Sequence, residues 1–121
     1  MSVFGRVWTE AADTFGVKRG CKEPLSPYGR TWGTILDRSE HAILVWGQKF
    51  GPLSPAQWTY CADLICHSLA YARKAPSPAE RYAYFHTQLT HLLNHETTQE
   101  GFEKRAVAEP ESNVVLDLLA S

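Results

Sequence analysis

The chain has 121 residues, of which 44% are apolar and 21% are charged, and its net charge is −1. This length and composition predict one folded domain with its own core and argue against a disordered chain. The longest apolar run, residues 42–46, is too short to cross a membrane, and residues 1–6 lack the apolar stretch of a signal peptide. Three cysteines fit a reducing compartment better than a disulfide framework. We therefore expect a cytoplasmic protein without a membrane partner.

The first half of the chain predicts three helices separated by a loop. Apolar residues at helical spacing indicate a helix over residues 2–15, and residues 17–25 form the loop that follows. A Ser-Pro pair at residues 26–27 predicts a short helix to residue 36, and Ser39 predicts the start of a third helix, residues 39–50. Gly51 and Pro52 then end that helix.

Two segments 23 residues apart, 54–57 and 77–80, contain the same helix-start pattern, Ser-Pro-Ala followed by Gln or Glu. A Ser at this position accepts a backbone N–H, Pro fits the first helical position, and Gln or Glu returns a hydrogen bond. The two segments therefore predict helices over residues 55–74 and 78–95. The first is expected to be the most buried helix, with Leu53 packing on Trp58 and an apolar stripe at Trp58, Cys61, Ala62, Ile65, Leu69 and Ala72.

These elements predict an all-α fold, a compact bundle of four to five helices over residues 1–95. Residues 1–95 carry ten Lys and Arg against seven Asp and Glu, whereas residues 96–121 carry two against six. The second segment shows no apolar face of core size. We interpret residues 96–121 as an acidic, partly flexible C-terminal arm.

The arm contains an apolar motif, Val114 to Leu119, interrupted by a single Asp. Such a motif either folds back onto its own domain or enters the groove of a partner. Residues 115–119 resemble bacterial sliding-clamp ligands, although the Gln that begins those ligands is missing. The motif predicts the partner-binding residues Leu116, Asp117, Leu118 and Leu119.

A second predicted partner-binding face lies on the helix over residues 78–95, at Tyr84, Gln88, His91 and His95. Its residues are spaced by four, three and four positions, which gives one polar face of a helix. His91 and His95 have the spacing of two metal ligands, but residues 87–94 supply no acidic ligand. The sequence therefore predicts no metal and no cofactor, while a histidine-dependent metal enzyme stays open as an alternative.

Nucleic-acid binding has only weak support in the sequence. Residues 39–74 have the outline of a helix-turn-helix, which would place Gln57, Thr59 and Tyr60 at a major groove. However, residues 51–72 contain no Lys or Arg to neutralise phosphates. Weak contact with single-stranded DNA is predicted for four basic residues outside this region, Lys18, Arg19, Lys22 and Arg30.

The stretch from Trp46 through residues 53–57 to residues 75–80 resembles phage replication P-type proteins, small adaptors that deliver a replicative helicase. The similarity covers about 35 of 121 residues and rests mainly on the two helix-start patterns. One departure is that Arg81 and Tyr82 stand where an aromatic residue should follow Glu80 directly. The resemblance implies a non-catalytic accessory protein of a mobile element and transfers no functional residue.

The sequence thus predicts a non-catalytic, protein-binding accessory factor of a phage or plasmid, acting as an adaptor in DNA replication. Its predicted partner is a replicative helicase or a sliding clamp, and no catalytic residue is predicted. Two alternatives remain: a phage-encoded, anti-CRISPR-like inhibitor of a host or defence complex, and the histidine-dependent metal enzyme.

Overall fold

A computed structural model describes residues 3–16 and 32–107 of the chain. These residues form an all-α bundle, which confirms the predicted fold class. In chain order the elements are α1 (Val3–Phe15), α2 (Trp32–Phe50), α3 (Pro55–Ala72), the 3₁₀ turn η1 (Pro78–Glu80), α4 (Arg81–Asn94) and α5 (Glu96–Val107). Within the described ranges, no helix combines the length and the apolar character needed to cross a membrane.

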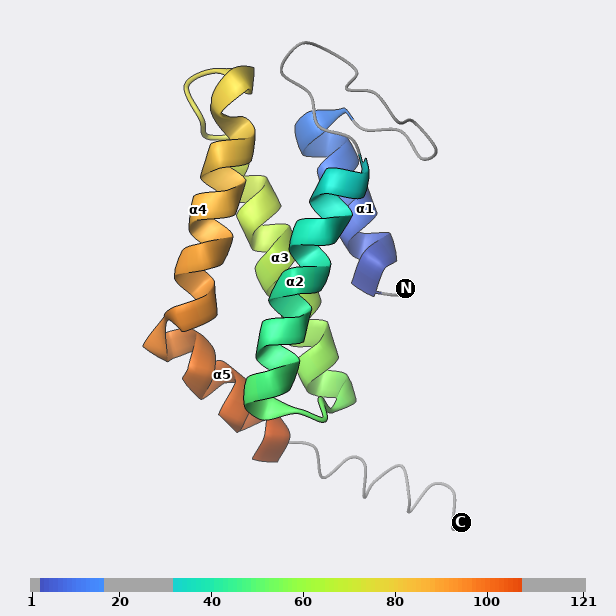
Figure 1. Cartoon of the computed structure of the whole chain (residues 1–121), viewed down its shortest axis with the longest axis vertical. Coiled ribbons are helices and arrows are strands. Elements are labelled where there is room, and N and C mark those ends of the chain that lie inside the picture. The colour runs from blue at the N-terminus through green and yellow to red at the C-terminus, as the bar shows by residue number, and fades with distance from the viewer. Residues whose placement is uncertain (1–2, 17–31, 108–121) are drawn as a thin grey trace.

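Helix α3 lies at the centre of the bundle, between α1 and α4, and α2 lies across the front of this layer (Figure 1). The most extensive helix contacts are those of α3 with α1 and with α4. Helices α1 and α3 run in the same direction, whereas α2 and α4 run in the opposite one (Figure 1). Helix α5 turns away from α4 and passes beneath the bundle, towards the connection between α2 and α3.

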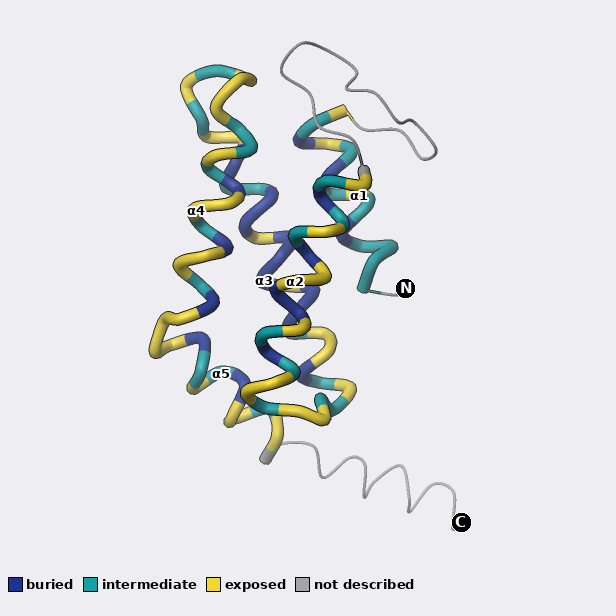
Figure 2. Tube along the Cα trace, viewed as in Figure 1, coloured by how far each residue is buried: buried dark blue, intermediate teal, exposed yellow. Residues whose placement is uncertain are grey.

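All five helices contribute buried apolar side chains to one core. Figure 2 shows these buried positions on the inner side of each helix, with exposed positions outside. Helix α3 is buried on most of its circumference, and its predicted apolar stripe is confirmed from Cys61 to Ala72. Trp58 is the exception, because 40% of its surface is exposed.

The two predicted helix starts behave differently. At α3, the Ser54 hydroxyl accepts the Gln57 N–H at 3.1 Å, and the Gln57 side-chain oxygen accepts the Ser54 N–H at 2.9 Å. This reciprocal capping confirms the first prediction. At the second site the prediction of a Ser77 cap is wrong, since the Ser77 side chain accepts no backbone N–H. Residues 78–80 form a 3₁₀ turn there, and α4 begins only at Arg81.

Helix α2 is continuous through Ser39, so the predicted helix start at this residue is wrong. The Ser39 side chain is buried, and its hydroxyl donates to the Ile35 carbonyl at 2.8 Å. A serine that bonds the carbonyl four residues earlier is satisfied within a helix and need not cap one. The preceding predicted helix, residues 26–36, lies partly outside the described residues.

Helix α5 packs on the bundle mainly through Phe102, although the sequence predicts an arm over residues 96–121. Phe102 is fully buried, stacks on Phe50 of α2 at 4.8 Å, and meets Trp46 and Tyr60 at 5.3 and 4.9 Å between ring centroids. The Gln57 side-chain amide donates to the Phe102 carbonyl at 2.9 Å. The core therefore continues beyond residue 95.

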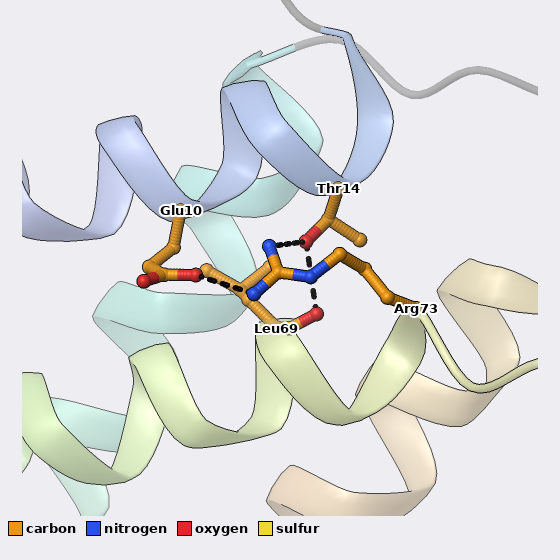
Figure 3. A network of polar contacts seen from close by, with 4 residues as sticks. All are labelled: Glu10, Thr14, Leu69 and Arg73. Atoms are coloured by element: carbon orange, nitrogen blue, oxygen red, sulfur yellow. Dashed lines mark hydrogen bonds and ion pairs between the residues drawn. The ribbon is translucent and has the colours of Figure 1, made fainter.

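A polar network joins α1 to the end of α3 at the opposite end of the bundle (Figure 3). The buried Thr14 hydroxyl donates to the Leu69 carbonyl at 2.9 Å, and the Arg73 guanidinium donates to that hydroxyl at 3.1 Å and to Glu10 at 3.2 Å. The Arg81 guanidinium donates to the Thr14 carbonyl at 2.8 Å. These bonds satisfy the last turn of α1 and hold it against α3 and α4.

Candidate functional site: an apolar groove between α2 and α3

Two large apolar side chains stand out among the described residues because they are exposed: Leu44, at 58% of its surface, and Trp58, at 40%. Isolated exposed apolar residues are common on protein surfaces and need no explanation. These two, however, line the same groove. An apolar depression with exposed aromatic and aliphatic walls is typical of a binding surface.

The groove has a volume of about 520 Å³ and lies where α2 ends and α3 begins. None of the described residues that line it carries a charge. Its walls are Ile43, Leu44, Gly47, Gln48, Gly51, Pro52, Leu53 and Trp58. A β-carbon placed on Gly47 would meet no other atom within 4 Å, so the absence of a side chain at this residue keeps the groove open.

Helix α1 lies beside the part of α3 that follows the groove-lining residue Trp58. Arg6 pairs with Asp63 at 2.7 Å, and Thr14 bonds Leu69 further along, so α1 runs parallel to α3 from about the level of its second turn. Figure 1 shows the joined ends of α2 and α3 extending past the start of α1. The first turn of α3 therefore has no α1 side chains beside it.

Trp58 was predicted to lie in the core and instead forms a wall of the groove. Its helical position continues the apolar stripe that Cys61 and Ile65 occupy inside the bundle. Periodicity identifies the face of a helix but not how far the neighbouring helix extends. The predicted neighbour of Trp58, Leu53, does line the same groove.

The predicted partner-binding face on α4 divides into two parts. Tyr84 and Gln88 are half-buried and line a small depression of about 270 Å³, where Tyr84 stacks on Tyr71 of α3 at 5.9 Å. His91 and His95 are exposed, with ring centroids 4.8 Å apart, and line a separate, open depression. The four residues thus lie along one helix but not in one pocket.

One member of the histidine pair, His95, has a structural role. The Nδ1 atom of His95 accepts the Thr97 N–H at 3.1 Å, which places this side chain at the start of α5. Within the described part of the chain, no three His, Cys, Asp or Glu side chains gather as metal ligands do. A metal bound here would have to use the other nitrogen of His95, since Nδ1 is occupied.

The two described cysteines lie in the core rather than at a reactive site. Burial raises the pKa of the Cys61 thiol to about 12 and that of the Cys66 thiol to about 11, with Arg6 opposing the shift at Cys66. Since the thiolate is the nucleophilic form, both side chains are protonated and unreactive near neutral pH.

Several predicted site residues lie outside the described residues: the basic residues Lys18, Arg19, Lys22 and Arg30, and the C-terminal residues Leu116, Asp117, Leu118 and Leu119. Of the three residues that the helix-turn-helix outline would place on DNA, Gln57 is only 2% exposed and is held by its bonds to Ser54 and Phe102. It has no free face with which to read a base.

No protein-family model matches this chain, and neither the curated proteins nor the solved structures include a significant match. The resemblance to helicase loaders therefore stays a prediction. Its landmarks have structural roles here, because Trp46 lies in the core and Ser54 and Gln57 cap α3.

Proposed function

We propose that this protein acts by binding another protein rather than by catalysis, and that the groove between α2 and α3 is the surface that holds its partner. The observation that carries this proposal is the pairing of Leu44 and Trp58 on the walls of one uncharged groove. Burying such walls under an apolar segment removes their surface from water, which favours association by roughly 25 cal/mol for each Å² of apolar area.

The chemistry of the groove limits what the partner segment can be. Because none of the described lining residues is charged, these residues offer no counter-ion for a phosphate or a carboxylate. Gln48 supplies the polar side chain among the described lining residues, so orientation would come from a few hydrogen bonds. An amphipathic helix or extended segment with two or three apolar anchors fits these conditions.

Within this class, an adaptor role in phage or plasmid DNA replication is the more specific proposal. The resemblance over residues 46–80 supports it, and this stretch includes the end of α2 and the whole of α3. The partner is then a replicative helicase. The clamp-ligand-like residues 115–119 make a sliding clamp the second candidate partner.

The test is direct binding of the full chain to a purified bacterial replicative helicase and to a purified sliding clamp, measured by calorimetry. Gly47→Leu fills the groove from its open side, and Leu44→Ser removes one apolar wall. His67→Leu is the matched control, because His67 is exposed on α3 away from the groove.

We expect both groove variants to weaken helicase binding at least tenfold and the control to leave it unchanged. Equal affinity of all variants for a protein that binds the parent chain would contradict the groove assignment. Binding to the clamp that is lost on Leu118→Asp, but kept in Gly47→Leu, would move the partner site to the C-terminal segment.

A further inference from the structure

The geometry points to an occupant of the groove within the same chain: we infer that residues 114–119, Val-Val-Leu-Asp-Leu-Leu, dock into the groove between α2 and α3 in cis. This inference rests on the proposed function, since it makes the apolar segment a competitor of the partner for one site. The sequence left open whether this motif folds back or binds elsewhere. Three observations favour folding back.

The first observation is where α5 ends. Phe102 stacks on Phe50, the last residue of α2, and the Arg105 guanidinium lies 3.8 Å above the Tyr60 ring of α3. The next residue after Phe50 is Gly51, which already lines the groove. The last turns of α5 are thus fixed beside the same connection that forms one end of the groove.

The second observation is the length of the tether. Val107 lies five residues beyond Phe102, which is about 7.5 Å along a helix. The six residues 108–113 span up to about 20 Å when extended. Since Phe102 already touches Phe50, this length is enough to bring Val114 around the connection to Gly51 and Leu53.

The third observation is chemical. The tether contains Glu109 and Glu111 and is unsuited to an uncharged groove, whereas five of the six residues that follow are apolar. A single charge, at Asp117, can point to solvent while its neighbours face Leu44 and Trp58. A short tether gives an effective concentration of about 1 mM, so even a millimolar affinity would fill half of the grooves.

The test uses the full chain labelled with ¹⁵N, with Cys21→Ser and Asn113→Cys, and a nitroxide spin label on the introduced thiol. We expect the label to broaden the amide signals of Leu44 and Gly47 and the indole signal of Trp58. Leu116→Asp with Leu119→Asp should abolish this broadening, as should Gly47→Leu, while His67→Leu should leave it intact.

Leu44→Ser serves as a second groove variant, since it removes an exposed side chain and cannot disturb the core. No broadening at these three residues in the parent chain would overturn the inference. A second experiment mixes equal amounts of chain that carries the spin label but no ¹⁵N and chain that carries ¹⁵N but no spin label. Broadening in this mixture would also overturn the inference, because the segment would then dock on a second copy.

This readout needs no partner, so the two proposals fail separately. If the broadening is present but the groove variants bind the helicase normally, the docking inference is supported and the proposed function is contradicted. If helicase binding depends on the groove but no broadening is seen, the proposed function is supported and the docking inference is contradicted. If both hold, the Leu116→Asp and Leu119→Asp chain should bind the helicase about tenfold more tightly when nine-tenths of the parent chains are closed.

Discussion

Gln57 illustrates how one side chain can serve two helices at once. Its oxygen completes the capping box of α3, and its amide donates to the Phe102 carbonyl of α5. The side chain is almost fully buried, so both of its polar atoms need these partners. The start of α3 and the position of α5 therefore depend on the same residue.

A pair of serine variants tests the capping assignments. We expect Ser54→Ala to lower the free energy of unfolding by about 1 kcal/mol, because the Gln57 N–H loses its acceptor. Ser77→Ala should change it by less than about 0.5 kcal/mol, since Ser77 accepts no backbone N–H. Urea denaturation of both variants measures the difference. Equal losses would show that η1 is capped by Ser77 after all.

The buried thiols give a second prediction at the scale of single residues. In a Cys21→Ser chain, we expect neither Cys61 nor Cys66 to react with a thiol reagent in the native state, and both to react in urea. Their pKa values are raised by folding, so the native state holds protons that the unfolded chain releases. The free energy of unfolding should therefore fall as the pH rises above about 9.

Rapid labelling of the native protein would contradict this assignment of the thiols. Rapid labelling of Cys66 in particular would indicate opening between α1 and α3, where Cys66 lies near Arg6. A Cys66→Ala chain separates the two thiols, because only Cys61 then remains to react.

At the scale of helices, two glycines predict opposite effects of the same substitution. Gly47→Ala should raise the free energy of unfolding by about 0.5–1 kcal/mol, since the added methyl group meets open space and alanine favours a helix. Gly101→Ala should lower it by about 1 kcal/mol, because the methyl group clashes with the end of the Tyr60 side chain.

Thermal or urea denaturation of the two glycine variants, measured side by side, checks this pair. Tyr60 cannot move aside freely, since its ring packs against both Phe102 and Arg105. A Gly101→Ala chain as stable as Gly47→Ala would mean that α5 is not held against α3 in solution.

The elements that the sequence predicted well are those with a strong periodic pattern. Helices α3 and α4 follow from repeated apolar residues, and the Ser54 cap fixes the start of α3. The continuous α2 was missed because Ser39 looks like a cap in sequence, while its hydroxyl is satisfied inside the helix by Ile35. Local patterns do not show which of these bonds a serine makes.

Most of the candidate site could not be predicted from the sequence. Trp58 belongs to an apolar stripe and looks buried, yet 40% of its surface is exposed, because α1 lies beside the later turns of α3. Phe102 is a single aromatic residue in an otherwise polar helix, so no periodicity marks it. Its burial depends on Trp46, Phe50 and Tyr60, which come from two other helices.

For the whole molecule, the position of Phe102 predicts where the chain can be shortened. A chain that ends at residue 95 loses α5 and uncovers Trp46, Phe50 and Tyr60. We expect its free energy of unfolding to fall by about 3–5 kcal/mol, the usual cost of removing one buried phenylalanine. That is a large share of the stability of a small domain. A chain that ends at residue 107 keeps these contacts and should retain a cooperative unfolding transition.

Circular dichroism melts of the two shortened chains, together with the full chain, measure this difference. We expect the shorter chain to melt far below the other two and to bind a dye that reports exposed apolar surface. If it melted together with the chain that ends at residue 107, α5 would contribute nothing to the fold.

The parallel packing of α1 on α3 sets the order in which the molecule can assemble. Arg6 and Asp63 are 57 residues apart in the chain, and the bond from Arg81 to Thr14 spans 67 residues. Closing a loop of this length costs about 3–4 kcal/mol in chain entropy before any contact is gained. Helices α3, α4 and α5 adjoin one another in sequence and can associate first. We therefore expect α1 to join last. Its contacts with α3 link residues far apart in the chain, which raises the contact order and predicts slower folding than for a helical bundle whose main contacts link consecutive helices.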